Sequence, residues 1–283
     1  MNVILKRGIK KAERAIKAFL PPEALLSFKH FRHRRDVSSF KSYVVHKRVG
    51  AVEFDFFVGD STGKKWYSKN TTSETPEMDA LHSLLIKPGD TVLECGAHHG
   101  YLTLLLSSWV GDQGKVIAFE PSETSFDILK KNIKINDREN IVPRMAAIGR
   151  KKGTIKISDS SCATVTGENI GYPVEMLPLD EFQHLKPDVI KIDVEGYEAD
   201  VLKGASEILK SKPKIAIELH TELLPLYHTS VSEVFSLFNA EQYNIWIQWT
   251  SDEKAILYKG EEINKRVHLF CIPKSDQSPQ ESP

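Results

Sequence analysis

The residues of this chain that are best suited to chemistry are acids and glycines at the ends of apolar stretches. "TVLECGAHHG" (91–100) begins apolar and β-branched, then enters a Gly-x-x-x-Gly turn, with Glu94 just before that turn. Gly96 would let the backbone turn and a ligand approach, because it has no Cβ. Gly100 would let a helix pack closely on the strand. Such a turn is typical of nucleotide-binding sites, although two glycines alone are a weak signal.

A second acid makes this signal stronger. Glu120 ends the apolar stretch "KVIAFE", and an acid about 20 residues beyond such a turn can accept hydrogen bonds from both hydroxyls of a ribose. A dinucleotide would bring its pyrophosphate close to Glu94, which would repel it. S-adenosylmethionine carries a ribose, an ammonium group and a sulfonium but no phosphate. The two acids therefore favour S-adenosylmethionine as the cofactor.

A third stretch, "VIKIDVEGYEADVLKGA" (189–205), places charges in an apolar strand. Lys191, Asp193 and Glu195 alternate there, so their side chains lean toward one face or edge. Ionisable groups in such a strand are costly unless they pair with one another or do chemistry. A purely structural pair between Lys191 and a carboxylate is the alternative.

Methyl transfer to an alcohol requires alignment of the reactants and removal of the hydroxyl proton. The candidate catalytic residues are Asp193, Glu195 and His220, of which His220 ends the stretch "KIAIELH" and has an intrinsic pKa suited to a base at neutral pH. Mg²⁺ bound by Asp193, Glu195 and Glu218 is a further hypothesis. The spacing does not require a metal, so no metal ligand is assigned.

The elements that would position these residues alternate between strand and helix from residue 78 onward. Apolar strands are expected at "TVLE", "KVIAFE", "NIVPRMAAIG", "DVIKIDV", "KIAIELH", "NIWIQW" and "VHLFCIP". Helical patterns lie between them, at 101–110, 122–135, 201–209 and after the capping pair Ser230 and Glu233. This order predicts a mostly parallel sheet with helices on both faces, whose ligands bind beyond the carboxyl ends of the strands. Before this region, "YVVHKRV", "VEFDFFV" and "KKWYSK" are expected to be strands, with "GDSTG" (59–63) as a hairpin turn.

At this point the sequence resembles a known family. "LECGAHHGYLTLLLS", "VIAFEPSETSFDILKKNI", "MLPLDEF", "DVIKIDVEGYEADVLKGA" and "KPKIAIELH" follow the order of the motifs of FkbM-type methyltransferases over about residues 76–220. The resemblance implies a class I, Rossmann-like fold with a seven-stranded sheet, S-adenosylmethionine as methyl donor, and O-methylation of a sugar or another small-molecule hydroxyl. Two positions depart from the family pattern: Glu94 replaces the usual Asp, and His98 the usual Asn.

The cofactor is expected to contact residues at the ends of the first four main strands, with the adenine near residues 146–148. These residues are Glu94, Gly96, Ala97, Gly100, Tyr101, Glu120, Pro121, Ala147 and Asp193.

Charge is distributed unevenly along the chain of 283 residues. Residues 1–50 hold 13 Lys or Arg against 3 Asp or Glu, whereas the whole chain has a net charge of zero. We expect a basic helical N-terminal arm (residues 1–40), a β-hairpin region packed on the core (41–75), a methyltransferase domain (76–273) and a disordered tail (274–283). The arm could contact an anionic surface or a partner. Its few aromatic residues make nucleic acid an unfavoured ligand.

The remaining composition sets limits on class and location. Three scattered cysteines argue against a disulfide framework and a structural zinc site. No apolar run is long enough for a spanning helix, so we expect a cytoplasmic protein, at most peripheral to a membrane. Two alternative functions stay open: a dinucleotide-dependent oxidoreductase, and a non-catalytic module that binds anionic partners through the arm.

Overall fold

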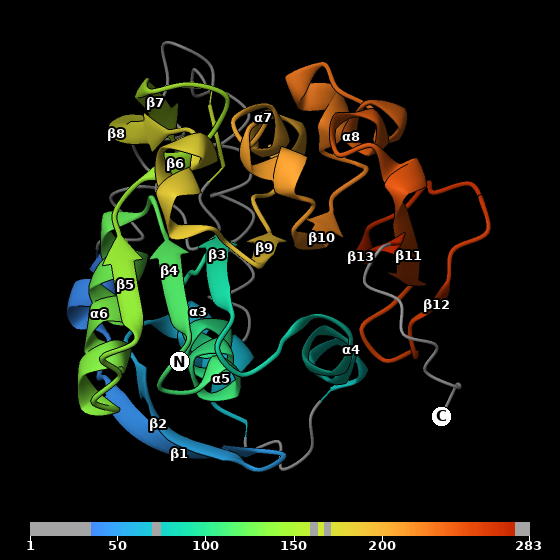
Figure 1. Ribbon diagram of the computed structural model, residues 1–283. Coiled ribbons are helices and arrows are strands. Elements are labelled where there is room, and N and C mark those ends of the chain that lie inside the picture. The colour runs from blue at the N-terminus through green and yellow to red at the C-terminus, as the bar shows by residue number, and fades with distance from the viewer. Residues whose placement is uncertain (1–34, 70–74, 159–163, 167–170, 275–283) are drawn as a thin grey trace, which may run out of the picture.

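The computed structural model describes residues 35–69, 75–158, 164–166 and 171–274, and its centre is an eight-stranded sheet (Figure 1). The strand order is β12-β11-β13-β10-β9-β3-β4-β5. Five neighbouring strands run parallel: β3 (Thr91–Cys95), β4 (Lys115–Phe119), β5 (Ile141–Arg144), β9 (Val189–Ile192) and β10 (Lys214–Leu219). β13 (Val267–Pro273) runs antiparallel between β10 and β11 (Tyr243–Gln248). The predicted α/β fold with seven main strands is confirmed, and the two-residue strand β12 (Ile256–Leu257) is added at one edge.

Helices cover both faces of this sheet, as predicted. One apolar cluster joins the sheet to α4 (Pro76–Leu85), α5 (Tyr101–Val110) and α6 (Glu123–Ile135). The other joins it to α7 (Glu198–Lys203) and α8 (Val231–Leu237) with the 3₁₀ segments around them. The helix expected over 201–209 is present as α7 but is shorter than predicted, because it ends at Lys203 with Gly204 as its C-cap. A Cβ on Gly204 would lie 2.1 Å from the carbonyl oxygen of Gly149, so the chain passes too close there for an ordinary helix residue.

Within residues 35–69 the structure contains one hairpin rather than two. β1 (Tyr43–Val49) and β2 (Val52–Val58) pair antiparallel, as predicted. The third strand expected at "KKWYSK" is wrong, because its first four residues form the end of α3 (Ser61–Tyr67) and Ser68 is the C-cap of that helix. Asp60 is the N-cap of α3, and its carboxylate accepts a hydrogen bond of 2.6 Å from the Gly63 N–H. "GDSTG" is therefore the start of a helix rather than a hairpin turn. An Asp with an extended backbone is a typical N-cap when its side chain accepts a hydrogen bond from the N–H three residues later.

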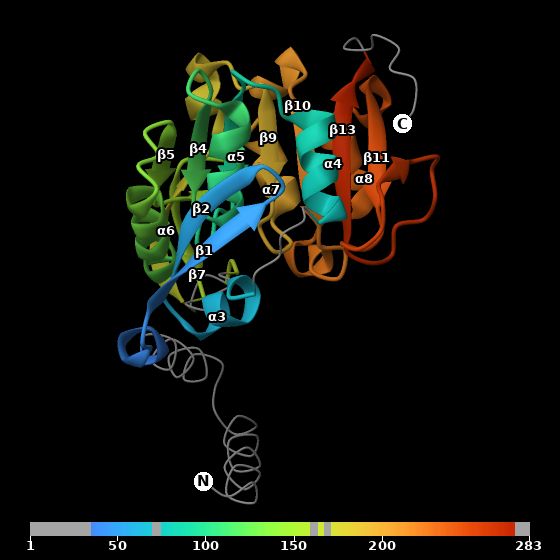
Figure 2. The ribbon, with the colours of Figure 1, turned by 90° about the horizontal axis from the view of Figure 1, so that it is seen from below.

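The hairpin is attached to the helical layer of the domain, across which it lies in Figure 2. Asn132 of α6 and Asn136, the C-cap of that helix, bind the edge of β2 that is not paired with β1. Asn132 Oδ1 accepts from the Phe57 N–H at 2.6 Å, and Asn136 donates to the Asp55 carbonyl at 2.7 Å. Phe54 and Phe56 are buried against the residues of α5. The hairpin thus completes the core on this face, and α3 follows directly from it.

A small second sheet lies beyond the carboxyl ends of the main strands (Figure 1). It contains β6 (Ala147–Ile148), β8 (Tyr172–Leu177) and β7 (Gly153–Ile157) in that order. The strand expected within "NIVPRMAAIG" is confirmed as β5, and a turn closed by a hydrogen bond from Ala146 N to Arg144 O separates it from β6. No helix in the described part of the chain is both long and apolar enough to cross a bilayer. The predicted basic arm lies almost wholly outside the described residues, as does the predicted tail apart from Lys274.

Candidate active site

A pocket lies at the carboxyl ends of β3, β4 and β9, at the edge where a parallel sheet places its ligands. Six residues singled out from the sequence line it: Gly96, Glu120, Pro121, Ala147, Asp193 and Glu195. Five others predicted to act in the site do not form part of its wall: Glu94, Ala97, Gly100, Tyr101 and His220. The acids at the strand ends are therefore brought together, whereas several neighbours in sequence face other elements.

The conformation of the turn after β3 explains its glycines. Gly96 has φ +90°, and a Cβ there would lie 1.9 Å from the Asp193 carbonyl oxygen. The space beside Gly96 is thus occupied by the end of β9, a reason for glycine that differs from the expected approach of a ligand. Gly100 has φ +87°, and a Cβ there would meet Leu129 of α6 at 2.5 Å. Both glycines keep the turn close to the elements that surround the pocket.

Glu120 is held by two backbone N–H groups, one in the turn after β3 and one at the N-cap of α6. One of its carboxylate oxygens accepts from the His98 N–H and the other from the Ser122 N–H, both at 2.8 Å. Burial raises the pKa of Glu120 to about 7, although these two hydrogen bonds oppose that rise. Each oxygen has a second lone pair, so the carboxylate can still accept a hydrogen bond from a ligand.

Glu94 lies behind the turn and faces α5. Its Oε2 accepts a 2.7 Å hydrogen bond from Thr103, and the residue is 1% exposed. Its Oε1 has no hydrogen-bond partner among the described residues. Burial raises the pKa of Glu94 to about 7, against the opposing effects of Lys191 and Thr103. Because Glu94 does not line the pocket, this buried oxygen does not face a ligand bound there.

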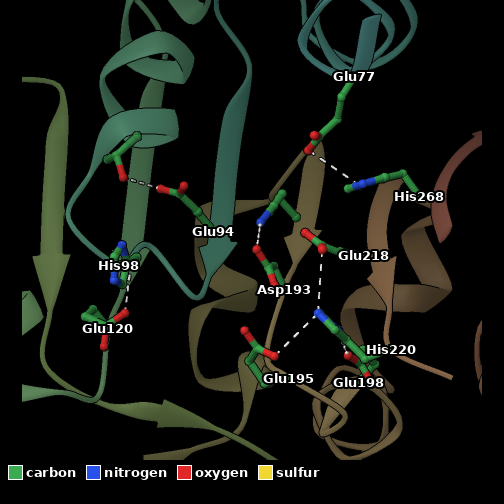
Figure 3. A network of polar contacts seen from close by, with 12 residues as sticks. Glu77, Glu94, His98, Glu120, Asp193, Glu195, Glu198, Glu218, His220 and His268 are labelled. Carbon is green, nitrogen blue, oxygen red and sulfur yellow. Dashed lines mark hydrogen bonds and ion pairs between the residues drawn. The ribbon is translucent and has the colours of Figure 1, made fainter. Parts of the chain in front are cut away.

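Asp193 and Glu195 form the acidic side of the pocket (Figure 3). Lys191 Nζ lies 2.9 Å from Asp193 Oδ2. Burial would raise the pKa of Asp193, but Lys191 and His220 outweigh it, so this pKa is lowered. Asp193 is therefore a charged partner of Lys191 at neutral pH.

His220 stands at the end of β10 within a group of carboxylates. Its Nδ1 lies 2.9 Å from Glu198 Oε1, and its Nε2 lies 3.6 Å from oxygens of both Glu195 and Glu218 (Figure 3). Burial would lower the pKa of His220, but the hydrogen bond to Glu198 and the nearby acids raise it to about 9. A cationic imidazole at neutral pH suits the positioning of carboxylates better than the acceptance of a proton.

The aromatic side of the pocket was missed from the sequence. Trp66 and Tyr67 of α3 line the pocket together with His98. The Tyr67 hydroxyl lies 2.9 Å from His98 Nδ1, and the rings of Trp66 and His98 lie 5.4 Å apart. Because "KKWYSK" was expected to be a strand, nothing directed these rings to the site. The Asp60 cap before them was the signal that could have placed a helix there.

Comparison with known proteins agrees with this geometry. A family model described as the methyltransferase FkbM domain matches residues 94–245, more than half of the chain. This chain belongs to the FkbM methyltransferase domain family. The resemblance seen in the sequence is thus confirmed, and the domain is a methyltransferase domain of this family. Glu120, which lines the pocket and can still accept a hydrogen bond, fits a ligand with a ribose.

Three proteins that are similar to this chain share at most 27% sequence identity with it. The hexuronic acid methyltransferase AglP of Haloferax volcanii is 27% identical over 161 residues, which cover 53% of this chain and 64% of that relative. The FkbM methyltransferase structure from Methylobacillus flagellatus is 19% identical with a TM-score of 0.44, over 69% of this chain and 50% of that one. An S-adenosylmethionine-dependent O-methyltransferase structure from Thermotoga maritima is 14% identical with a TM-score of 0.46, over 81% and 76%.

Proposed function

We propose that this protein transfers a methyl group from S-adenosylmethionine to a hydroxyl group of a sugar, a glycan or another small metabolite. The observation that carries the proposal is the pocket in which buried Glu120 and the acids Asp193 and Glu195 face one space. A relative whose name describes methylation of a hexuronic acid supports a sugar as the acceptor.

The chain offers a separate group for each part of the cofactor. Glu120 is proposed to accept hydrogen bonds from the ribose hydroxyls. The apolar wall of Phe119, Ala147 and Ile148 would take the adenine, and the turn at Gly96 the methionine end. The cofactor supplies a methyl group that is already activated on its sulfonium. The protein then needs mainly to align the acceptor and to exclude water.

The acceptor hydroxyl must lose its proton as the methyl group is transferred. Asp193, Glu195 and His220 are proposed to deal with this proton as a unit, because their ligating atoms lie within 4.8 Å of one another. Asp193 and Glu195 also line the pocket, and His220 stands behind them. Glu195 has the most exposed side chain of the three, at 31%, so its substitution should disturb the buried charges least.

Glu195→Gln should lower the rate of methyl transfer by about 100-fold or more, because glutamine cannot accept the proton that the acceptor hydroxyl loses. S-adenosylmethionine affinity should change by less than about threefold. The measurement is transfer of labelled methyl to a panel of sugars that includes hexuronic acids, with calorimetry for the cofactor. Glu222→Gln, a nearby exposed position, is the control. Full activity of Glu195→Gln, or cofactor binding by the wild-type protein without methylation of any hydroxyl, would count against the proposal.

A further inference from the structure

The unit at the ends of β9 and β10 has the chemistry of a cation site. Asp193, Glu195 and His220 each offer one ligand atom, and these atoms all lie within 4.8 Å of one another. Two carboxylates and an imidazole from the ends of neighbouring strands are a common set of protein ligands for a divalent transition metal.

The imidazole is oriented as a metal ligand would be. His220 Nδ1 lies 2.9 Å from Glu198 Oε1, and the same oxygen accepts a 2.9 Å hydrogen bond from the Gly196 N–H. The side chains of His220 and Glu198 are 3% and 0% exposed. This contact fixes the ring and turns Nε2 toward the other acids (Figure 3). A buried carboxylate behind a histidine is the usual support of a metal-bound imidazole.

The other ring nitrogen of the buried His220 side chain has no hydrogen bond to a described residue. Nε2 of His220 lies 3.6 Å from Glu195 Oε2 and 3.6 Å from Glu218 Oε1, beyond hydrogen-bond distance of both. A cation between these atoms would satisfy the nitrogen and the carboxylates together.

We propose that Asp193, Glu195 and His220 bind one divalent transition-metal cation, Mn²⁺ or Zn²⁺, with Glu218 beside it and Glu198 as the support of His220. The cation takes the place of the proton on His220 Nε2, and this proton is released to solvent on binding. The imidazole ligand favours these ions over Mg²⁺. Because two of the ligands line the pocket, the cation lies where it can bind the acceptor hydroxyl and lower its pKa. This role rests on the proposed function, whereas the binding of the cation does not.

A second cluster nearby provides a control. Glu77 on α4, Glu218 and His268 also bring ligand atoms within 4.8 Å of one another. His268 Nδ1 lies 3.5 Å from Glu77, so this ring nitrogen already faces one acid of its own cluster. Glu77 and His268 do not line the pocket, so a cation at this second cluster would not reach the acceptor.

The test is titration of the full chain with Mn²⁺ after treatment with a chelator, followed by loss of the paramagnetic resonance signal of free Mn²⁺. The wild-type protein should bind one Mn²⁺ per chain. Glu195→Gln and Glu198→Gln should each weaken binding at least tenfold, the size expected for loss of a ligand or of its support. Glu77→Gln should bind as the wild type does. Circular dichroism melts confirm that each variant is folded.

Several results would overturn the cation site. These are no binding to the wild-type protein, equal binding to all variants, or binding lost in Glu77→Gln and kept in Glu195→Gln. Calorimetry with S-adenosylmethionine on the same samples keeps the two proposals apart. Cofactor binding without Mn²⁺ binding removes the cation alone, and Mn²⁺ binding without cofactor binding removes the proposed function.

Discussion

At the scale of single residues, the site depends on backbone positions as much as on side chains. Gly96 and Gly89 have almost the same φ, at +90° and +91°. They differ in surroundings, since a Cβ on Gly96 would meet the Asp193 carbonyl at 1.9 Å and one on Gly89 would meet nothing within 4 Å. The pair separates the cost of a positive φ from the cost of a clash.

Gly96→Ala should destabilise the protein by about 3 kcal/mol or more, because backbone must move at the junction of β3 and β9. Gly89→Ala should cost about 1 kcal/mol, the strain of alanine at positive φ alone. Urea unfolding measures both values. Similar losses in the two variants would show that the contact with Asp193 does not constrain the turn.

The ionisation of Glu120 should set the pH dependence of cofactor binding. Burial raises its pKa to about 7, and protonation would compete with the two N–H groups that its oxygens accept from. Because the carboxylate is the form that accepts ribose hydroxyls, affinity for S-adenosylhomocysteine should rise about tenfold from pH 6 to pH 8. Calorimetry at constant ionic strength measures this change. An affinity that is constant or falls over this range would contradict the assignment.

How far the site residues could be predicted depends on whether their signals are local. Glu120, Asp193 and Glu195 follow apolar strands directly, and parallel strands bring such positions to one edge. Glu94 was placed correctly at a strand end, but its side chain turns toward Thr103, a direction that spacing does not reveal. The conformation of Gly96 was foreseen, whereas its contact with Asp193 joins segments far apart in sequence and was not.

At the scale of elements, α3 links the N-terminal hairpin to the turn after β3. Asp60 caps α3 and also lies 3.5 Å from the buried His99. Burial would raise the pKa of Asp60, but His99 and the Gly63 N–H outweigh it and lower that pKa. The last residue of α3, Tyr67, contacts His98 in the turn. The cap therefore fixes the aromatic side of the pocket as well as the helix.

Asp60→Ala should destabilise the protein by about 2–4 kcal/mol, because it removes the cap and leaves His99 buried without this partner. It should also weaken binding of S-adenosylmethionine. Ser230→Ala is the matched control, since Ser230 caps α8 through a 3.3 Å hydrogen bond from the Glu233 N–H. This loss should cost about 1 kcal/mol and leave binding unchanged. Equal effects of the two variants on stability and binding would contradict the linking role of α3.

At the scale of the whole molecule, the alternation of apolar strands and helices was sufficient to predict the fold class. The seven-residue strand β13 is buried at six positions, and its sequence pattern was sufficient to predict it. The short strands β6 and β12 contain two residues each, and β7 and β8 are partly exposed, so their patterns were too weak to predict the second sheet or the added edge strand. The basic arm and its anionic partner stay predictions, because almost all of the arm lies outside the described residues.

The most direct test of the central claim, that Glu120 binds the ribose of S-adenosylmethionine in this pocket, is calorimetric titration with S-adenosylmethionine and with NAD⁺. The wild-type protein should bind S-adenosylmethionine and not NAD⁺. Glu120→Ala should weaken that binding about 100-fold or more, as expected for loss of two hydrogen bonds to a charged group. Glu139→Ala, an exposed position just before β5, should leave it unchanged. Unchanged affinity in Glu120→Ala, or binding of NAD⁺ in place of S-adenosylmethionine, would contradict the account.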